Sequence, residues 1–187
     1  MVKKRTCVFI SGKGSNLKNL IYYSRDYNFP IKISLVITNS ANAKGINYAK
    51  KNKIPFIYIN TKRPAYEEKI LQHLKKYKIS FICLAGYMKI ISNRLIKDYQ
   101  KKIINIHPSL LPKFKGLNTF SRILKNNEIK TGCTVHFVNK ELDSGNRIVQ
   151  KSFFIKKNDD ETGLKKKTQL LEYKALPEAI IKIFRYI

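Results

Sequence analysis

Apolar and polar stretches alternate along the first 106 residues in a pattern that predicts strands and helices in turn. Short apolar runs bounded by polar turns indicate buried strands at residues 5–10, 31–39, 55–59, 80–86 and 102–106. Apolar residues at helical spacing predict helices between them, at residues 17–26, 41–53, 65–78 and 93–100. Such alternation is typical of parallel strands joined by helices. We therefore expect an α/β fold with a Rossmann-like, doubly wound sheet whose parallel half ends near residue 106.

The pattern changes after Gly116. It predicts a short helix, two strands and a long final helix, at residues 119–126, 131–138, 147–155 and 161–187. The two strands follow each other closely, which favours an antiparallel pair near the C-terminus. The final helix would be interrupted near Pro177, because proline cannot donate a backbone hydrogen bond.

Length and composition favour one compact domain, residues 1–187. The chain has 187 residues, of which 43% are apolar, so it can bury a sizeable core. It contains no apolar run of about 18 residues, the length at which a membrane helix is expected. The first residues, "MVKKRTCVFISGKG", carry too short an apolar run for a secretory signal.

Three widely spaced cysteines, Cys7, Cys83 and Cys133, each lie in an apolar run that predicts a strand. An odd number of such residues favours buried free thiols in a reducing compartment, so we expect a cytoplasmic protein. The chain contains neither CxxC nor HExxH spacing, and we expect no metal site.

The formal net charge of +26 raises the question of nucleic-acid binding. Lysine, isoleucine and asparagine are abundant together, as expected of an A- and T-rich genome, and the lysines are spread along the whole chain. The sequence shows no basic arm and no aromatic RNA-binding motif. We therefore expect small-molecule substrates and neither nucleic acid nor membrane as partners, although the charge would attract anionic ligands.

The stretch "SGKGSNL" follows the first predicted strand, where α/β sheets commonly bind anions. Gly14, Ser15 and Asn16 precede or begin a helix, whose first N–H groups are free to bind phosphate. The dinucleotide fingerprint is incomplete, because Leu17 occupies its third glycine position and no acidic residue follows the second strand. The stretch favours a phosphate monoester; the alternative is a tight turn without a ligand.

A second candidate site surrounds "NIHPSLLPKFKG". Asn105 and His107 are two apart at the end of a predicted strand, so their side chains should point to the same side. Asp143 lies in a turn between the two late strands, where its simplest role is to cap its own backbone. Together an amide, an imidazole and a carboxylate suit oxyanion stabilisation and proton transfer. No activated serine or cysteine nucleophile is evident, which favours direct transfer to an external nucleophile.

Four stretches in this order, "SGKGSNL", "LAGYMKII", "NIHPSLLPKFKGLNT" and "HFVNKELDSG", resemble the folate-dependent glycinamide ribonucleotide formyltransferases. The resemblance implies formyl transfer from 10-formyltetrahydrofolate, a co-substrate, to the amine of glycinamide ribonucleotide in purine biosynthesis. It assigns catalysis to Asn105, His107 and Asp143. It assigns ribonucleotide binding to Gly14, Ser15, Asn16 and Glu172, and folate binding to Arg63, Met88, Lys89, Ile90, Ile91 and Asn105.

In the implied reaction the amine attacks the formyl carbon, and Asn105 and protonated His107 stabilise the tetrahedral oxyanion. Asp143 supports the imidazolium, while His136 is a neighbouring strand residue with a supporting role. Lys89 stands where the family usually has arginine, in a contact that is largely made by the backbone. The resemblance leaves the state of assembly open as monomer or homodimer.

Three alternatives remain at this point. The catalytic domain of a methionyl-tRNA formyltransferase shares the asparagine, histidine and aspartate, but that family has a second, tRNA-binding domain and lacks this glycine loop. A formyltetrahydrofolate hydrolase would add an N-terminal regulatory domain. A lysine-rich nucleic-acid binder on the same fold would have no need of an intact catalytic set.

Overall fold

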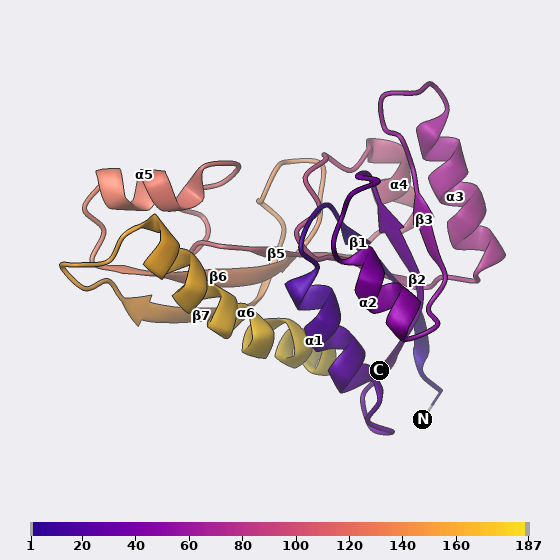
Figure 1. Ribbon diagram of the computed structural model, residues 1–187, viewed down its shortest axis with the longest axis horizontal. Coiled ribbons are helices and arrows are strands. Elements are labelled where there is room, and N and C mark those ends of the chain that lie inside the picture. The colour runs from indigo at the N-terminus through magenta and orange to yellow at the C-terminus, as the bar shows by residue number, and fades with distance from the viewer. Residues whose placement is uncertain (1, 186–187) are drawn as a thin grey trace. The chain divides into compact units, whose positions relative to one another are not determined.

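The computed structural model describes residues 2–185, which form two compact units divided between Ile104 and Asn105. Parallel strands and helices alternate in the first unit, whereas the second unit contains an antiparallel strand pair and the C-terminal helix (Figure 1). The predicted α/β fold class, with a parallel N-terminal half and late antiparallel strands, is confirmed. That residues 1–187 form one domain stays a prediction.

The first unit contains four parallel strands in the order β3-β2-β1-β4. The elements are β1 Lys4–Ile10, α1 Ser15–Ser24, β2 Ile31–Thr38, α2 Ile46–Lys51, β3 Phe56–Tyr58, α3 Tyr66–Lys76, β4 Phe81–Leu84 and α4 Asn93–Asp98. Parallel strands are buried where helices cover both faces of the sheet. The last five residues of β1 and all four of β4 are buried.

Helix α2 is much shorter than the sequence predicts, since it begins at Ile46 and not near residue 41. Turns occupy residues 41–45, and the N–H of Gly45 donates to the carbonyl of Gly12 over 3.0 Å. The backbone before α2 is therefore held by a contact with a distant loop, which helical periodicity cannot reveal.

The division between the two units falls within β5 Ile103–His107, whose first two residues belong to the first unit and whose last three belong to the second. The second unit also contains α5 Thr119–Lys125, β6 Lys130–Phe137, β7 Arg147–Phe154 and α6 Glu161–Phe184. Its strand order is β5-β6-β7, and β6 and β7 are antiparallel, as predicted. Helix α6 packs along β6 and β7 (Figure 1).

Helix α6 continues through Pro177 without a break, so the predicted interruption is wrong. Pro177 is buried among apolar residues of the helix, including Leu176 and Ile180. Burial of this face against the strands holds the helix together where proline removes one backbone bond. Residues 186 and 187 of the predicted helix lie outside the described residues.

Within residues 2–185, none of the helices combines the length and apolar character needed to cross a bilayer. All three cysteines are buried free thiols.

Candidate active site

Asn105 and His107 project from β5 to the same aspartate, as the alternation of a strand requires. The Nδ2 atom of Asn105 donates to Oδ1 of Asp143 over 3.3 Å. The Nδ1 atom of His107 lies 3.2 Å from Oδ2 of the same carboxylate. His107 is 5% exposed and Asp143 7% exposed, so this contact is almost free of water. The structure thus brings together the three residues assigned to catalysis.

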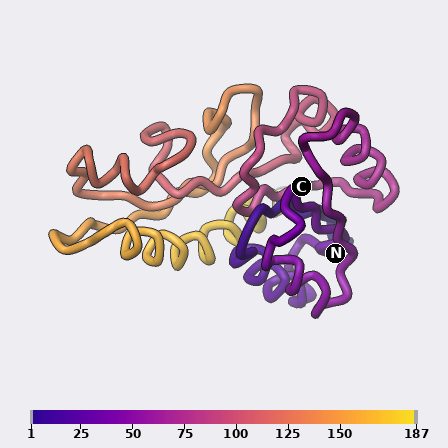
Figure 2. The backbone as a smooth tube through the Cα atoms, turned by 45° about the horizontal axis from the view of Figure 1, so that its top comes forward, coloured from indigo at the N-terminus to yellow at the C-terminus, as the bar shows by residue number. Residues whose placement is uncertain are grey.

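Asp143 reaches this position from the long β6–β7 connection, residues 138–146, drawn in orange in Figure 2. Its backbone has a φ of 50°, a conformation that aspartate tolerates better than most residues. Its Oδ2 also accepts from the N–H of Gly116 over 2.9 Å. The carboxylate therefore serves residues far from its own turn, which contradicts the simpler role of capping that turn.

His136 is a fourth member of the cluster and is more central than the sequence suggests. Its Nε2 lies 3.5 Å from Oδ1 of Asp143 and 3.2 Å from Nδ2 of Asn105. Its Nδ1 lies 2.9 Å from the carbonyl oxygen of Phe137, which can only accept. Nδ1 therefore carries a proton, and Nε2 is available to accept from Asn105. Both amide hydrogens of Asn105 thus have partners, at distances long enough to be exchanged for a substrate oxygen.

The surroundings of His107 are arranged for an imidazolium. One ring nitrogen faces Asp143, and Nε2 lies 2.8 Å from the carbonyl oxygen of Phe114. Both oxygens only accept, so both contacts become hydrogen bonds only when the ring is doubly protonated. Burial opposes that charge and lowers the pKa of His107 below its ordinary value, although Phe114 and Asp143 act in the opposite direction. Burial thus favours the neutral ring, while a second proton would find an acceptor at each nitrogen.

The carboxylate of Asp143 remains ionised. Burial alone would raise its pKa, but the hydrogen bond from the N–H of Gly116 and the nearby rings of His136 and His107 together lower the pKa below its ordinary value. A fixed negative charge beside His107 favours proton uptake by the ring when a substrate supplies the proton.

The loop after His107 is held by Thr134 of β6. The Oγ1 of Thr134 donates to the carbonyl of Ser109 over 2.7 Å and accepts from the N–H of Leu111 over 3.0 Å. The Ser109 hydroxyl donates to the carbonyl of Lys113 over 2.7 Å. These contacts fix the loop that carries the carbonyl of Phe114 to His107.

In the first unit, Gly14 precedes helix α1 with a φ of +69°, while Ser15 and Asn16 form the first turn. A side chain on Gly14 would place its Cβ 2.5 Å from the Cα of Gly45. The glycine is thus required by its own backbone conformation and by contact with Gly45, and not only by the approach of a ligand. Gly14 occupies the cap position of α1, so no side chain caps the start of this helix.

Apart from Asn105 on β5, the residues assigned to folate lie in loops of the first unit. Arg63 is exposed and lines a pocket of about 330 Å³ beyond β3. The N–H of Met88 donates to the hydroxyl of Ser11 over 2.7 Å, and that hydroxyl donates to Asn39 over 2.6 Å. The side chains of Met88, Lys89 and Ile90 are exposed, whereas that of Ile91 is buried. Any contact of Ile91 with a ligand would therefore involve its backbone.

Ser11 and Asn39 were missed by the sequence reasoning. They stand at the carboxyl ends of β1 and β2 and connect these ends to the loop after β4. A polar residue directly after an apolar strand is a usable signal, because ligands of α/β sheets bind at those ends.

Glu172, assigned to the ribonucleotide, is half-buried on α6. Burial, and then the negative charge of Glu172, raise the pKa of Cys133 on β6 to about 12. The carboxylate thus faces β6 in the second unit. Among the described residues, no group of three histidines, cysteines or carboxylates is arranged to hold a metal ion.

Comparisons with known proteins identify the family. A family model described as formyl transferase matches residues 4–180. The chain is 42% identical over 184 residues to the trifunctional purine biosynthetic protein adenosine-3 of Drosophila pseudoobscura pseudoobscura, covering 95% of this chain and 14% of the relative. The Homo sapiens protein of the same name is 39% identical over 182 residues, with 95% and 18% covered. The chain thus spans under a fifth of the length of these curated relatives.

Two solved structures are similar to this chain over most of their own length. The phosphoribosylglycinamide formyltransferase of Bacillus halodurans is 35% identical with a TM-score of 0.93, covering 96% of this chain and 95% of that one. The enzyme of Anaplasma phagocytophilum is 36% identical with a TM-score of 0.90, covering 96% and 86%. The chain therefore belongs to the formyl transferase family, together with these phosphoribosylglycinamide formyltransferases.

Proposed function

We propose that the protein transfers the formyl group of 10-formyltetrahydrofolate to the amine of glycinamide ribonucleotide, a step of purine biosynthesis. The observation that carries the proposal is the convergence of Asn105, His107 and Asp143 in a buried cluster of a formyl transferase fold. When an amine attacks a formyl carbon, an oxyanion forms and a proton must be moved. An amide donor can stabilise the oxyanion, an imidazole can move the proton, and a carboxylate can stabilise the protonated imidazole.

In the second unit, Nε2 of His107 would exchange the carbonyl of Phe114 for the attacking amine and accept its proton as the carbon–nitrogen bond forms. This neutral starting state replaces the protonated His107 expected from the sequence. Asn105 would turn one N–H from its long contacts toward the developing oxyanion. Asp143 would stabilise the imidazolium until His107 returns the proton to N10 of the departing folate. The resting pKa of His107, lowered by burial, supports a base that starts neutral and ends charged.

For substrate binding we propose separate roles for the two units. In the first unit, the N–H groups of Gly14, Ser15 and Asn16 would bind the ribonucleotide phosphate, and Arg63 with residues 88–91 would bind folate. In the second unit, Glu172 would bind the ribonucleotide and Asn105 would contact the formyl donor. The start of a helix favours an anion by about 0.3–2 kcal/mol, which supports the phosphate assignment.

The deciding assay offers the purified protein 10-formyltetrahydrofolate with either glycinamide ribonucleotide or methionyl-tRNA. We expect turnover only with the ribonucleotide. Turnover with methionyl-tRNA alone would refute the substrate assignment but preserve the family chemistry. The absence of turnover with both, in a protein that keeps its fold by circular dichroism, would refute the enzymatic proposal.

We further propose a cytoplasmic enzyme that acts as a monomer or homodimer, without nucleic acid, membrane or metal. The three buried thiols support a reducing compartment. Activity that persists in a chelator is the expected result for a metal-free reaction.

A further inference from the structure

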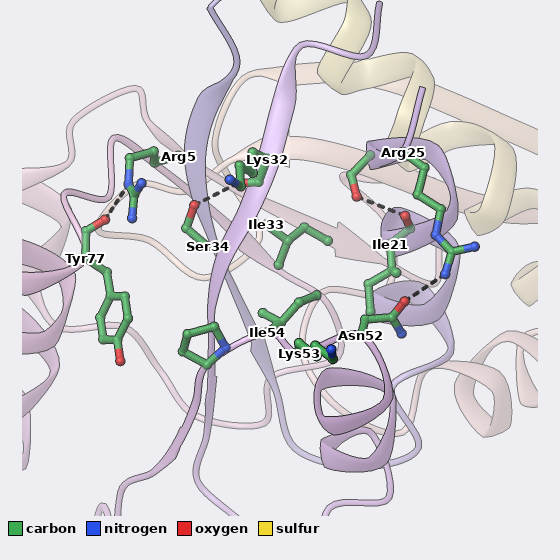
Figure 3. A pocket seen from close by; sticks show the side chains of 12 residues that line it. Arg5, Ile21, Arg25, Lys32, Ile33, Ser34, Asn52, Lys53, Ile54 and Tyr77 are labelled. Carbon is green, nitrogen blue, oxygen red and sulfur yellow. Dashed lines mark hydrogen bonds between the residues drawn. The ribbon is translucent and has the colours of Figure 1, made fainter. Parts of the chain in front are cut away.

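A strongly basic pocket of about 480 Å³ lies in the first unit (Figure 3). It stands at the opposite end of β1 and β2 from Ser11 and Asn39. Four cationic side chains line it, namely those of Arg5, Arg25, Lys32 and Lys53, and none of the lining residues is acidic. Arg5 and Lys32 are second residues of their strands, so the pocket lies at the amino ends of β1 and β2. The residues of the candidate active site play no part in it.

Among residues 2–185, no carboxylate forms an ion pair with a cationic side chain of this pocket. Arg5 and Lys32 are register partners on neighbouring strands, so two exposed cationic side chains start from adjacent positions, where like charges repel. Arg5 donates to the carbonyl of Tyr77 over 2.7 Å, and Arg25 donates to the amide oxygen of Asn52 over 2.8 Å. Both acceptors are neutral, so these bonds hold the guanidinium groups in position and leave their charge and further N–H donors for a ligand.

The strand pairing is distorted at the same place. Thr6 pairs with Ile33 and Cys7 with Leu35, so Ser34 is an extra residue in β2. Ser34 lines the pocket, and its hydroxyl donates to the carbonyl of Lys32 over 3.3 Å. Bulges of this kind frequently stand beside binding sites, where they redirect a side chain.

The floor of the pocket is apolar. Ile33 and Ile54 lie between Arg5 on one side and Arg25 on the other (Figure 3). The volume is within the range of small-molecule sites, which combine an apolar lining with a few fixed polar groups. A ligand suited to both parts has a flat, largely apolar body and several negative charges.

We propose that this pocket binds a nucleoside polyphosphate, with its base on the isoleucine floor and its phosphates between the cationic side chains. Binding would relieve the repulsion between Arg5 and Lys32. The proposal is independent of the formyl transfer proposed above, because it concerns the other end of the strands.

Isothermal titration calorimetry with ATP tests the proposal on the whole protein. The double variant Lys32→Gln, Lys53→Asn removes two charges; asparagine suits the φ of 53° at residue 53. The matched control, Lys157→Gln with Lys166→Gln, removes two exposed charges elsewhere. We expect ATP binding to weaken roughly tenfold in the first variant and to be unchanged in the control. Equal weakening in both would show that only the overall charge attracts ATP and would overturn the proposal.

Four further measurements test the parts of this proposal. Inorganic triphosphate should bind clearly more weakly than ATP, and equal affinity would refute a role for the apolar floor. Lys32→Gln alone should raise the thermal midpoint of the ligand-free protein, whereas a lower midpoint would refute the repulsion between Arg5 and Lys32. Displacement of ATP by glycinamide ribonucleotide would place ATP at the helix α1 loop and overturn the assignment. Formyl transfer by the Lys32, Lys53 variant should equal that of the wild type.

Discussion

The imidazole of His107 and the carboxylate of Asp143 face each other at 3.2 Å, although 36 residues separate them in the sequence. The carboxylate acts to raise the pKa of the ring, while burial lowers it further than the carboxylate raises it. For the base proposed above, the carboxylate is already in place to stabilise the protonated ring.

Replacement of Asp143 by asparagine should change the pH profile as well as the rate. We expect kcat/KM of the wild type to fall on the acid side with an apparent pKa below 6.5, because a protonated His107 cannot accept a proton. Asp143→Asn removes a charge that raises the pKa of His107, so this acid limb should move to lower pH. The plateau rate should fall as well. An unchanged limb, in a variant of normal stability, would show that Asp143 does not act through His107.

Asn105→Ala should reduce kcat by about 10²–10³, the usual cost of losing one oxyanion donor. Asn105→Asp is the matched comparison, since it keeps the size but adds a second carboxylate beside Asp143 and should also lower kcat. Single-turnover kinetics at saturating substrate separate this loss from a change in binding. A normal rate for Asn105→Ala would exclude the amide as the oxyanion donor.

Acid should destabilise the folded protein in the range below pH 6.5. The pKa of His107 is lower in the folded state than in the unfolded chain, so between the two values the unfolded chain binds more protons. Stability then falls as the pH falls, by at most about 1.4 kcal/mol per pH unit for one proton. Asp143 adds a second loss below about pH 3.8, because its pKa is lowered too.

Urea unfolding of the wild type and of His107→Gln between pH 8 and pH 5 isolates the first of these losses. The glutamine variant should have a smaller decrease in the free energy of unfolding over this range. An identical decrease would assign the acid sensitivity to other groups.

Ser15→Asp should weaken ribonucleotide binding selectively. An aspartate in the first turn of α1 interacts well with the helix dipole but repels a phosphate at the same N–H groups. We expect a higher KM for glycinamide ribonucleotide, little change in the KM for 10-formyltetrahydrofolate, and no loss of thermal stability. Ser15→Ala serves as the neutral control. Equal increases of both KM values would count against the phosphate assignment.

Gly145→Ala should unfold the loop that carries Asp143. A Cβ at residue 145 would lie 1.7 Å from the carbonyl oxygen of Phe137, which the backbone cannot accommodate. We expect a large decrease in thermal stability together with loss of activity. Gly12→Ala is a suitable control, because no atom lies within 4 Å of the Cβ that it would add.

The local alternation of apolar and polar residues was sufficient to predict most strands and helices of this fold. Alternation along β5 correctly directs Asn105 and His107 to one side, and apolar runs locate the strands because the sheet buries them on both faces. The contacts of Asp143 with Asn105 and His107 could not be predicted from such local patterns. Its own turn was the simplest target, and only the path of the β6–β7 loop brings the carboxylate to β5.

His136 shows the same limit. Its position in the apolar stretch "TVHFV" predicts a buried strand residue, and a histidine there is a visible anomaly. Its contacts with Asn105 and Asp143 depend on the pairing of strands, which composition does not encode. The start of α2 and the continuity of α6 through Pro177 were likewise decided by packing between distant segments.

The contact between Gly14 and Gly45 restricts how the loop before helix α1, residues 11–14, can evolve. Enlargement of one partner in a packed pair is usually rescued by reduction of the other, but here both positions already hold the smallest residue. A library that randomises residues 14 and 45 together should recover almost only the parental combination. Changes of loop length within residues 40–44 are the accessible alternative, because they move the backbone of Gly45 without adding atoms at the contact.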